Sequence, residues 1–126
     1  MLKIWVAALL AVFNIANGLL ALFDAPGWYA SVPGASATGD FNPHFVQDIG
    51  AAFLAAGLGL AARAWRERYW PAAMAGAVFL VSHALIHIWG MGHGDTQFLA
   101  SDLAFVVAPA LLAVWAALPR KAAAHV

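Results

Sequence analysis

The sequence predicts an all-α protein, an antiparallel bundle of four transmembrane helices, from three observations. Of its 126 residues, 64% are hydrophobic and only 10% are charged, a balance typical of membrane proteins. Four apolar stretches each approach the length of about 20 residues that a helix needs to cross a bilayer. All the basic residues fall on one side of these stretches. We therefore expect residues 1–126 to form a single integral membrane domain.

The first apolar stretch follows Lys3 and has the general form of a signal peptide. Its uninterrupted run is as long as a spanning helix, however, whereas the apolar core of a signal peptide covers only about 7–15 residues. We therefore expect a retained helix at this end of the chain. The four expected helices run roughly over residues 4–23, 45–62, 71–91 and 98–118.

Capping residues support the starts of the later helices. Asn42 can cap the second helix. Pro43 suits the first position of that helix, because a backbone N–H there would have no hydrogen-bond partner within the helix. Pro71 can open the third helix in the same way, and Asp95 or Thr96 can cap the fourth. These signals place the connections between the apolar stretches.

Two features indicate how the helices pack. The second helix carries Gly50, Gly57 and Gly59 among several alanines, and small residues allow helices to approach closely in lipid. Pro109 lies inside the fourth helix, where its ring and missing N–H predict a kink. We expect a tight bundle that is interrupted at this proline.

The basic residues set the expected orientation. They lie before the first helix, between the second and third, and after the fourth, which is one side of the bundle. The positive-inside rule makes that side cytoplasmic, so both termini are expected inside. The residues are Lys3, Arg63, Arg66, Arg68, Arg120 and Lys121.

The third helix carries two histidines in an otherwise apolar segment. His83 and His87 are four residues apart and share one helix face. Ionisable groups at membrane depth are costly, which makes them functional-site candidates. The predicted topology places further polar residues at the same depth, in the outer half of the bundle, and none in the inner half. We expect one buried polar site lined by Asn14, Asn17, Asp48, His83, His87 and Asp102, with His44 at its mouth.

The leading hypothesis for this site is a divalent transition metal, zinc or iron. Two histidines on one helix and a carboxylate from a facing helix form a typical set with open positions. The ligands would be His83 and His87 with Asp48, Asp102 or His44. Cysteine is absent, which excludes thiolate ligands and disulfides. This hypothesis describes a small metal-dependent membrane enzyme that acts on a lipophilic molecule.

Three alternatives remain open. His83 or His87 could share a proton with Asp48 or Asp102, in metal-free acid–base chemistry of the isomerase or hydratase type. Haem is a second alternative, and because His83 and His87 lie on one face, His44 would have to supply the other axial ligand. The polar residues could also pair only to fix helix packing. In the functional cases, Asn14 and Asn17 would bind the cofactor or substrate.

The segment GDFNPHFVQDIG, residues 39–50, follows a long first loop and opens the second helix. With the four-helix layout, it resembles small bacterial membrane proteins of the DoxX-like kind. The resemblance implies a multi-pass protein of the bacterial cytoplasmic membrane. It adds an accessory subunit of a membrane oxidoreductase, binding quinone or haem, to the candidate functions.

The expected partners follow from composition and charge. A formal net charge of +0 gives no reason to expect nucleic acid. Membrane lipid and a lipophilic small molecule are expected instead. Four short helices leave much lateral surface, which is compatible with a homo-oligomer or a larger membrane complex.

Overall fold

The structure is a computed structural model that describes residues 1–119, and every regular element in that range is a helix. The all-α class is therefore confirmed for the described residues. Arg120 and Lys121, expected on the inner side, lie outside them. The elements are α1 (Leu2–Phe23), α2 (Ala25–Ser31), the 3-10 turn η1 (Ala35–Ala37), α3 (Pro43–Trp65), the 3-10 turn η2 (Glu67–Tyr69), α4 (Trp70–Gly92), α5 (Leu99–Asp102), the π-helix η3 (Leu103–Val107) and α6 (Ala108–Ala117).

Four helical segments are long and apolar enough to cross a membrane, as the sequence predicts. Their ends differ from the predicted boundaries by a few residues only. Much of their outward surface consists of large apolar side chains, a property that suits a lipid environment. The segments are Leu2–Phe23, Pro43–Trp65, Glu67–Gly92 and Leu99–Ala117.

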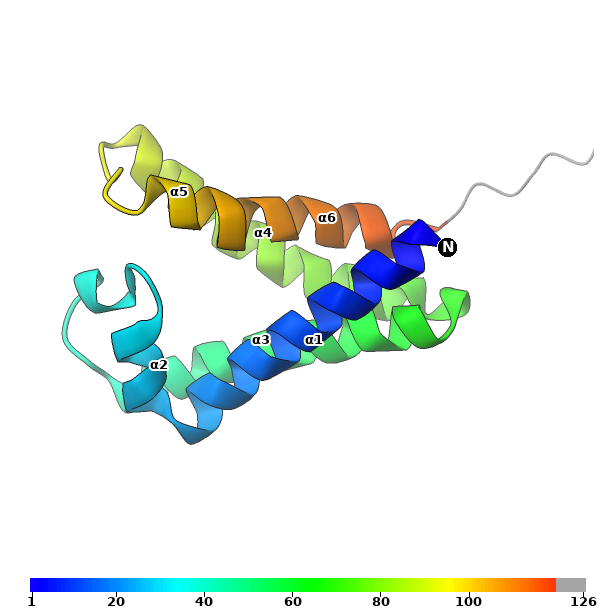
Figure 1. The fold of residues 1–126 in the computed structure, drawn as a ribbon, viewed down its shortest axis with the longest axis horizontal. Coiled ribbons are helices and arrows are strands. Elements are labelled where there is room, and N and C mark those ends of the chain that lie inside the picture. Colours follow the sequence, from blue (N-terminus) through cyan, green and yellow to red (C-terminus); the bar gives the residue numbers. More distant parts are fainter. Residues whose placement is uncertain (120–126) are drawn as a thin grey trace, which may run out of the picture.

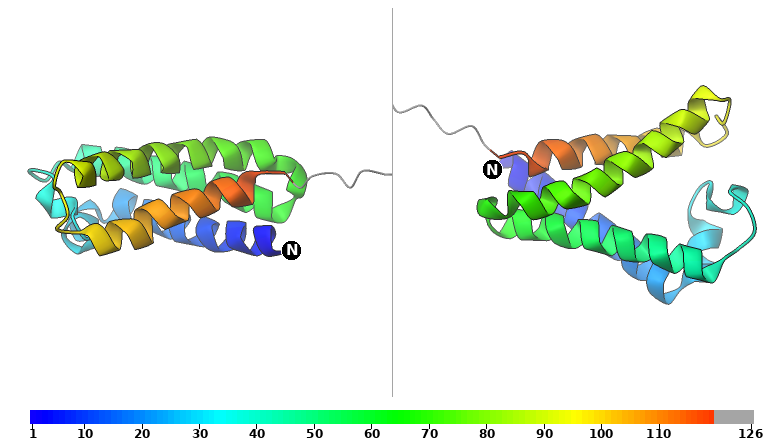
Figure 2. Two further views of the ribbon diagram at one scale, coloured as in Figure 1. Left: turned by 90° about the horizontal axis from the view of Figure 1, so that it is seen from above. Right: turned by 180° about the vertical axis from the view of Figure 1, so that it is seen from behind.

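The long helices form two pairs that spread apart like the arms of a V (Figure 1). One arm consists of α1 and α3, and the other of α4 with the continuous segment α5–η3–α6. The arms meet at the end where the N-terminus lies, and the view from behind in Figure 2 shows the same divergence. We call the open end the α2 end, because α2 and η1 lie there, and the other the closed end.

The arm formed by α1 and α3 is held by direct backbone contact. A Cβ atom added at Gly18 of α1 would lie 2.6 Å from the Leu54 nitrogen and 2.7 Å from the Gly50 oxygen of α3. A Cβ atom added at Gly57 of α3 would likewise lie 2.8 Å from the Ile15 nitrogen of α1. Gly50 and Gly57 therefore face α1, whereas Gly59 faces α4, where an added Cβ would lie 2.4 Å from the Ala72 oxygen.

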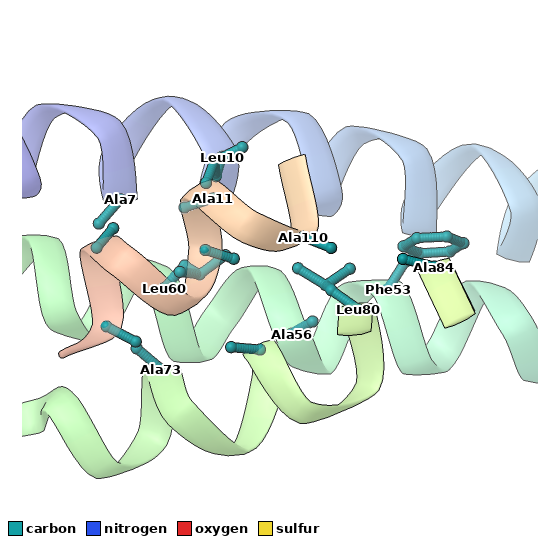
Figure 3. Packing of buried hydrophobic residues seen from close by; sticks show 14 residues of the cluster. Ala7, Leu10, Ala11, Phe53, Ala56, Leu60, Ala73, Leu80, Ala84 and Ala110 are labelled. Atoms are coloured by element: carbon teal, nitrogen blue, oxygen red, sulfur yellow. The ribbon is translucent and has the colours of Figure 1, made fainter. Parts of the chain in front are cut away.

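The apolar core fills the region where the arms meet (Figure 3). Much of it is alanine, including Ala7, Ala73 and Ala113, which are all fully buried. Towards the α2 end the core extends to Ala84 and includes Phe53 and Leu80, one from each arm. These two side chains also line the space between the arms and therefore form its floor.

The helix starts are partly as predicted. The Asn42 side chain accepts a hydrogen bond from the Phe45 nitrogen at 3.2 Å, which confirms the cap of α3. Pro71 lies in the first turn of α4, one position after its first residue. The cap predicted for the fourth segment is wrong, because α5 follows Phe98 without a side-chain cap.

The fourth segment changes its helical form just before Pro109. Residues Leu103–Val107 form a π-helix, in which the Ala108 nitrogen donates to the carbonyl oxygen of Leu103, five residues back. Proline has no N–H, so the usual bond from position 109 to the Phe105 carbonyl cannot form. The irregularity that the sequence predicts at this proline is thus a π-helix, a form that is frequent at functional sites.

Candidate functional site

A cleft of about 640 Å³ lies between the two arms at the α2 end. Volumes of about 300–1,000 Å³ are typical of small-molecule sites. The lining is mostly apolar and aromatic, with a few polar side chains, as is usual for such sites. The polar residues of interest come from both arms: Asn14, Asn17, His83, His87, Asp95 and Asp102.

A contact between two ionisable side chains in the cleft joins α4 to α5. His87 Nδ1 lies 3.2 Å from Asp102 Oδ1, and the side chains are 30% and 13% exposed. A carboxylate next to Nδ1 fixes the ring orientation and leaves Nε2 as the other reactive nitrogen. Asp102 is the last residue of α5 and directly precedes η3.

His83 lies one turn deeper than His87 along α4. The centroids of the two imidazole rings are 4.8 Å apart. His83 also meets the edge of Phe53 at 5.6 Å and stacks on Phe79 at 6.0 Å. Its surroundings are therefore aromatic on the side of the floor and polar on the side of His87.

Both asparagines of α1 line the cleft but differ in their partners. Asn17 Oδ1 accepts a hydrogen bond from Trp28 Nε1 at 2.8 Å, which holds α2 against α1. Asn14 is 1% exposed, and its Nδ2 donates to the Leu10 carbonyl at 2.7 Å. Asn14 Oδ1 is buried without a hydrogen-bond partner among the described residues. This orphan acceptor is exceptional, because buried polar atoms are usually paired.

Asp48 and His44 are not brought to the cleft. They pair weakly with each other at 3.8 Å, with side chains 66% and 86% exposed, and neither lines the cleft. The buried stripe of α3 runs through Val46, Gly50 and Phe53. Asp48 is two positions from the first two of these, about 200° around the helix, and therefore faces away. The sequence contains a signal for this orientation, because Gly50 and Gly57 mark the packing face of the helix and Asp48 is not on that face.

Arg63 is a buried residue that sequence reasoning placed in a loop. It lies inside α3 near the closed end and is 0% exposed. None of its three guanidinium nitrogens has a hydrogen-bond partner among residues 1–119. The expectation that the inner half of the bundle is free of polar groups is therefore wrong. Arg63 continues the buried stripe, three positions after Leu60. Because the predicted helix ends at residue 62, the prediction leaves Arg63 outside the helix and misses its place on the buried face.

The metal hypothesis finds only part of its ligand set. No group of three or more histidine, aspartate or glutamate side chains in the described part of the chain is placed to hold a metal ion together. His83, His87 and Asp102 share the cleft, whereas Asp48 and His44 lie elsewhere. The exposed His44 is also the residue that a bis-histidine haem would require.

Charge is strongly segregated along the molecule. The basic residues of the described range, Lys3, Arg63, Arg66 and Arg68, all lie at the closed end. Except for Glu67, the acidic residues lie at the α2 end. They are Asp24, Asp40, Asp48, Asp95 and Asp102.

Comparisons with known proteins leave the site to be interpreted from its own chemistry. No family model matches the sequence, and searches among curated proteins and solved structures return no match. The resemblance to DoxX-like proteins therefore stays a prediction. In the described residues, the fold and site define an all-helical protein with four long apolar helical segments and, at one end, a mostly apolar cleft that contains a few polar side chains.

Proposed function

We propose that this chain is an antiparallel bundle of four transmembrane helices that binds a lipophilic small molecule in its cleft and exchanges a proton with it. The observation that carries the proposal is the His87–Asp102 pair, 3.2 Å apart inside a largely apolar cleft of about 640 Å³. Of the site chemistries that the sequence allows, acid–base chemistry needs only groups that already lie together.

The role of each group follows from its position. His87 Nε2 takes a proton from the bound molecule and returns one after the molecule has rearranged, so that the proton count is unchanged. Asp102 orients the ring through Nδ1 and stabilises the imidazolium form. His83 and Asn14 line the deeper part of the cleft and contact the ligand. This proton transfer is of the isomerase type, because the ligand gains and loses one proton and nothing else.

The charge segregation supports the membrane orientation. With basic residues at the closed end, the positive-inside rule makes that end cytoplasmic and opens the cleft on the outer side. The chain has no cysteine, so single-cysteine variants report topology cleanly. In intact cells, a membrane-impermeant maleimide should label Ser36→Cys at the α2 end and spare Arg66→Cys. The reverse pattern would invert the proposed orientation.

Metal-dependent chemistry is the second candidate, favoured by the 4.8 Å separation of the His83 and His87 rings beside Asp102. Zinc or iron would be held by His83 and His87 with open positions on the ion, because Asp102 does not complete a three-residue ligand group in the described part of the chain. Elemental analysis and an absorption spectrum of the purified protein distinguish the two candidates. Stoichiometric metal that is lost in His87→Ala would replace the acid–base proposal, and a Soret band would indicate haem.

Neutral red tests the acid–base proposal, because this planar lipophilic base changes its absorbance on protonation. Ser101 lines the cleft, whereas the exposed Ala104 on the same segment does not. In lipid nanodiscs, the dye should slow maleimide labelling of Ser101→Cys but not of Ala104→Cys. Equal labelling rates with and without the dye would overturn the binding proposal.

Proton exchange is read from the spectrum of the bound dye. Asp102→Asn should abolish the spectral change on binding, because the orienting carboxylate is lost. Asp48→Asn removes an equal charge outside the cleft and should leave the change intact. A change that survives Asp102→Asn would overturn the proton-transfer role and leave the binding site standing.

A further inference from the structure

We infer that the ligand of the cleft is a lipophilic ammonium ion, an apolar molecule with a positively charged N–H group. The inference rests on the proposed function and names the chemical class of its ligand. Three features of the cleft support it: carboxylates without basic residues among the described lining, an orphan acceptor and an aromatic lining.

The charges of the cleft favour a cation. Asp40, Asp95 and Asp102 line it, and no lysine or arginine of the described chain does. Asp102 lies against His87, whereas Asp40 and Asp95 are exposed in the loops at the α2 end, and no lysine or arginine side chain among the described lining residues balances them. In a cleft with low-dielectric walls, unbalanced carboxylates attract cations and repel anions. A phosphate or carboxylate headgroup is therefore disfavoured.

The orphan acceptor calls for a hydrogen-bond donor. Asn14 is buried and lines the cleft, and its Oδ1 lacks a partner among the described residues. The orientation of the amide is fixed, because the Leu10 carbonyl can bond only to the NH₂ side. An unpaired buried acceptor costs free energy that a ligand N–H recovers. This requirement selects a protonated amine over a cation without N–H groups.

The aromatic lining suits the same ligand. Trp28, Tyr29, Phe45 and Phe98 line the cleft at the α2 end, near the carboxylates. The faces of aromatic rings attract cations, most strongly where water is excluded. Phe53 and Leu80 at the floor provide an apolar surface for the remainder of the molecule. A ligand whose N–H group reaches Asn14 and whose body extends towards the α2 end would contact both the floor and the aromatic rings of the cleft.

A pair of ions with equal shape and opposite charge tests the charge preference. Tetraphenylphosphonium and tetraphenylborate are added to nanodiscs of neutral lipid at equal membrane-bound concentrations. Protection of Ser101→Cys against maleimide is measured, and Ala104→Cys is the control, because Ala104 does not line the cleft. We expect the cation to protect at least tenfold more strongly than the anion. Asp95→Asn should reduce this preference, whereas Asp48→Asn, outside the cleft, should leave it unchanged.

The outcomes separate this inference from the proposed function. Equal protection by both ions, or stronger protection by the borate, overturns the ammonium inference while the cleft remains a binding site. Protection by neither ion overturns it too. If neutral red also fails to protect Ser101→Cys, the proposed function fails with it.

Asn14 provides a test of the N–H group. Benzyldimethylammonium has one N–H where benzyltrimethylammonium has a methyl group, and both carry one positive charge. A hydrogen bond from a charged donor corresponds to about tenfold in affinity. Benzyldimethylammonium, which has the N–H, should therefore bind the wild type about tenfold more tightly than benzyltrimethylammonium. Asn14→Leu should remove this difference, and Gln47→Leu, which removes a carboxamide outside the cleft, should not. An equal affinity of both ions for the wild type would contradict the role of Asn14.

Discussion

His87 on α4 and Asp102 on α5 are 3.2 Å apart, and this contact ties together two helices of the same arm where the cleft opens. The pair is mostly screened from solvent, with exposures of 30% and 13%. The other histidine–aspartate pair, His44–Asp48, joins residues of one helix and is exposed. The two pairs offer an internal comparison between a contact within a cleft and a contact on the surface.

A double-mutant cycle should show coupling in the first pair only. Asp102→Asn and His87→Gln, alone and together, are expected to give an interaction free energy of about 1 kcal/mol, typical of contacting polar groups. His44→Gln and Asp48→Asn should give a value near zero, because exposed pairs contribute little. Reversible unfolding in mixed detergent micelles measures both cycles. Equal coupling in the two pairs would mean that the cleft does not strengthen the contact.

The contact between α1 and α3 should tolerate no side chain at Gly18. Its Cβ would come within 3 Å of the backbone of α3, which cannot move aside. Gly18→Ala is therefore expected to lower the free energy of unfolding by about 1–3 kcal/mol. Gly92→Ala is the matched control, because a Cβ there meets nothing within 4 Å. A stability unchanged by Gly18→Ala would show that the two helices can separate without cost.

Arg63 should lower the free energy of unfolding relative to an apolar residue at the same position. Its guanidinium is fully buried and has no hydrogen-bond partner among the described residues. Replacing a buried charge with an apolar side chain of similar size is often stabilising by about 1–4 kcal/mol. Arg63→Met should therefore raise the free energy of unfolding. Arg66→Met removes the same charge from an exposed site and serves as the control. A large destabilisation by Arg63→Met alone would reveal a partner that stabilises the guanidinium.

The sequence predicts the helices well because hydropathy and capping are local properties. Asn42 caps α3 as predicted, through a bond to a backbone nitrogen three residues away. The cap predicted at Asp95 or Thr96 failed because the chain there makes other local bonds, such as that from the Asp95 nitrogen to the Gly90 carbonyl. The fourth segment accordingly starts later, after Phe98.

The candidate site was predicted only in part, because its assembly depends on helix rotation. Depth along an axis follows from residue number, and it correctly grouped Asn14, His83 and Asp102 at one end. The rotation of α3 is set by the glycines that meet α1, and it turns Asp48 outward. The divergence of the two arms has no signal in any single helix. The sequence therefore predicts a polar pocket in this half of the bundle but not the separation of the arms that forms the cleft.

The π-helix before Pro109 should be required for the position of Asp102. In a π-helix the hydrogen bond spans one residue more than in an α-helix, and each residue of an α-helix turns the chain by about 100°. Pro109→Ala supplies the missing N–H, so the segment can return to regular α-helical bonding with the Phe105 carbonyl. Asp102 would then rotate by about 100° relative to α6 and leave His87.

Pro109→Ala should therefore abolish the coupling between His87 and Asp102 and lower the protection of Ser101→Cys by tetraphenylphosphonium, even though helix content rises. Pro119→Ala is the control, since Pro119 follows the end of α6 and takes no part in helical bonding. The coupling is measured by the unfolding cycle in the Pro109→Ala background. If it persists there, packing against α4 rather than the proline maintains the π-helix, and the position of Asp102 is a property of the whole arm.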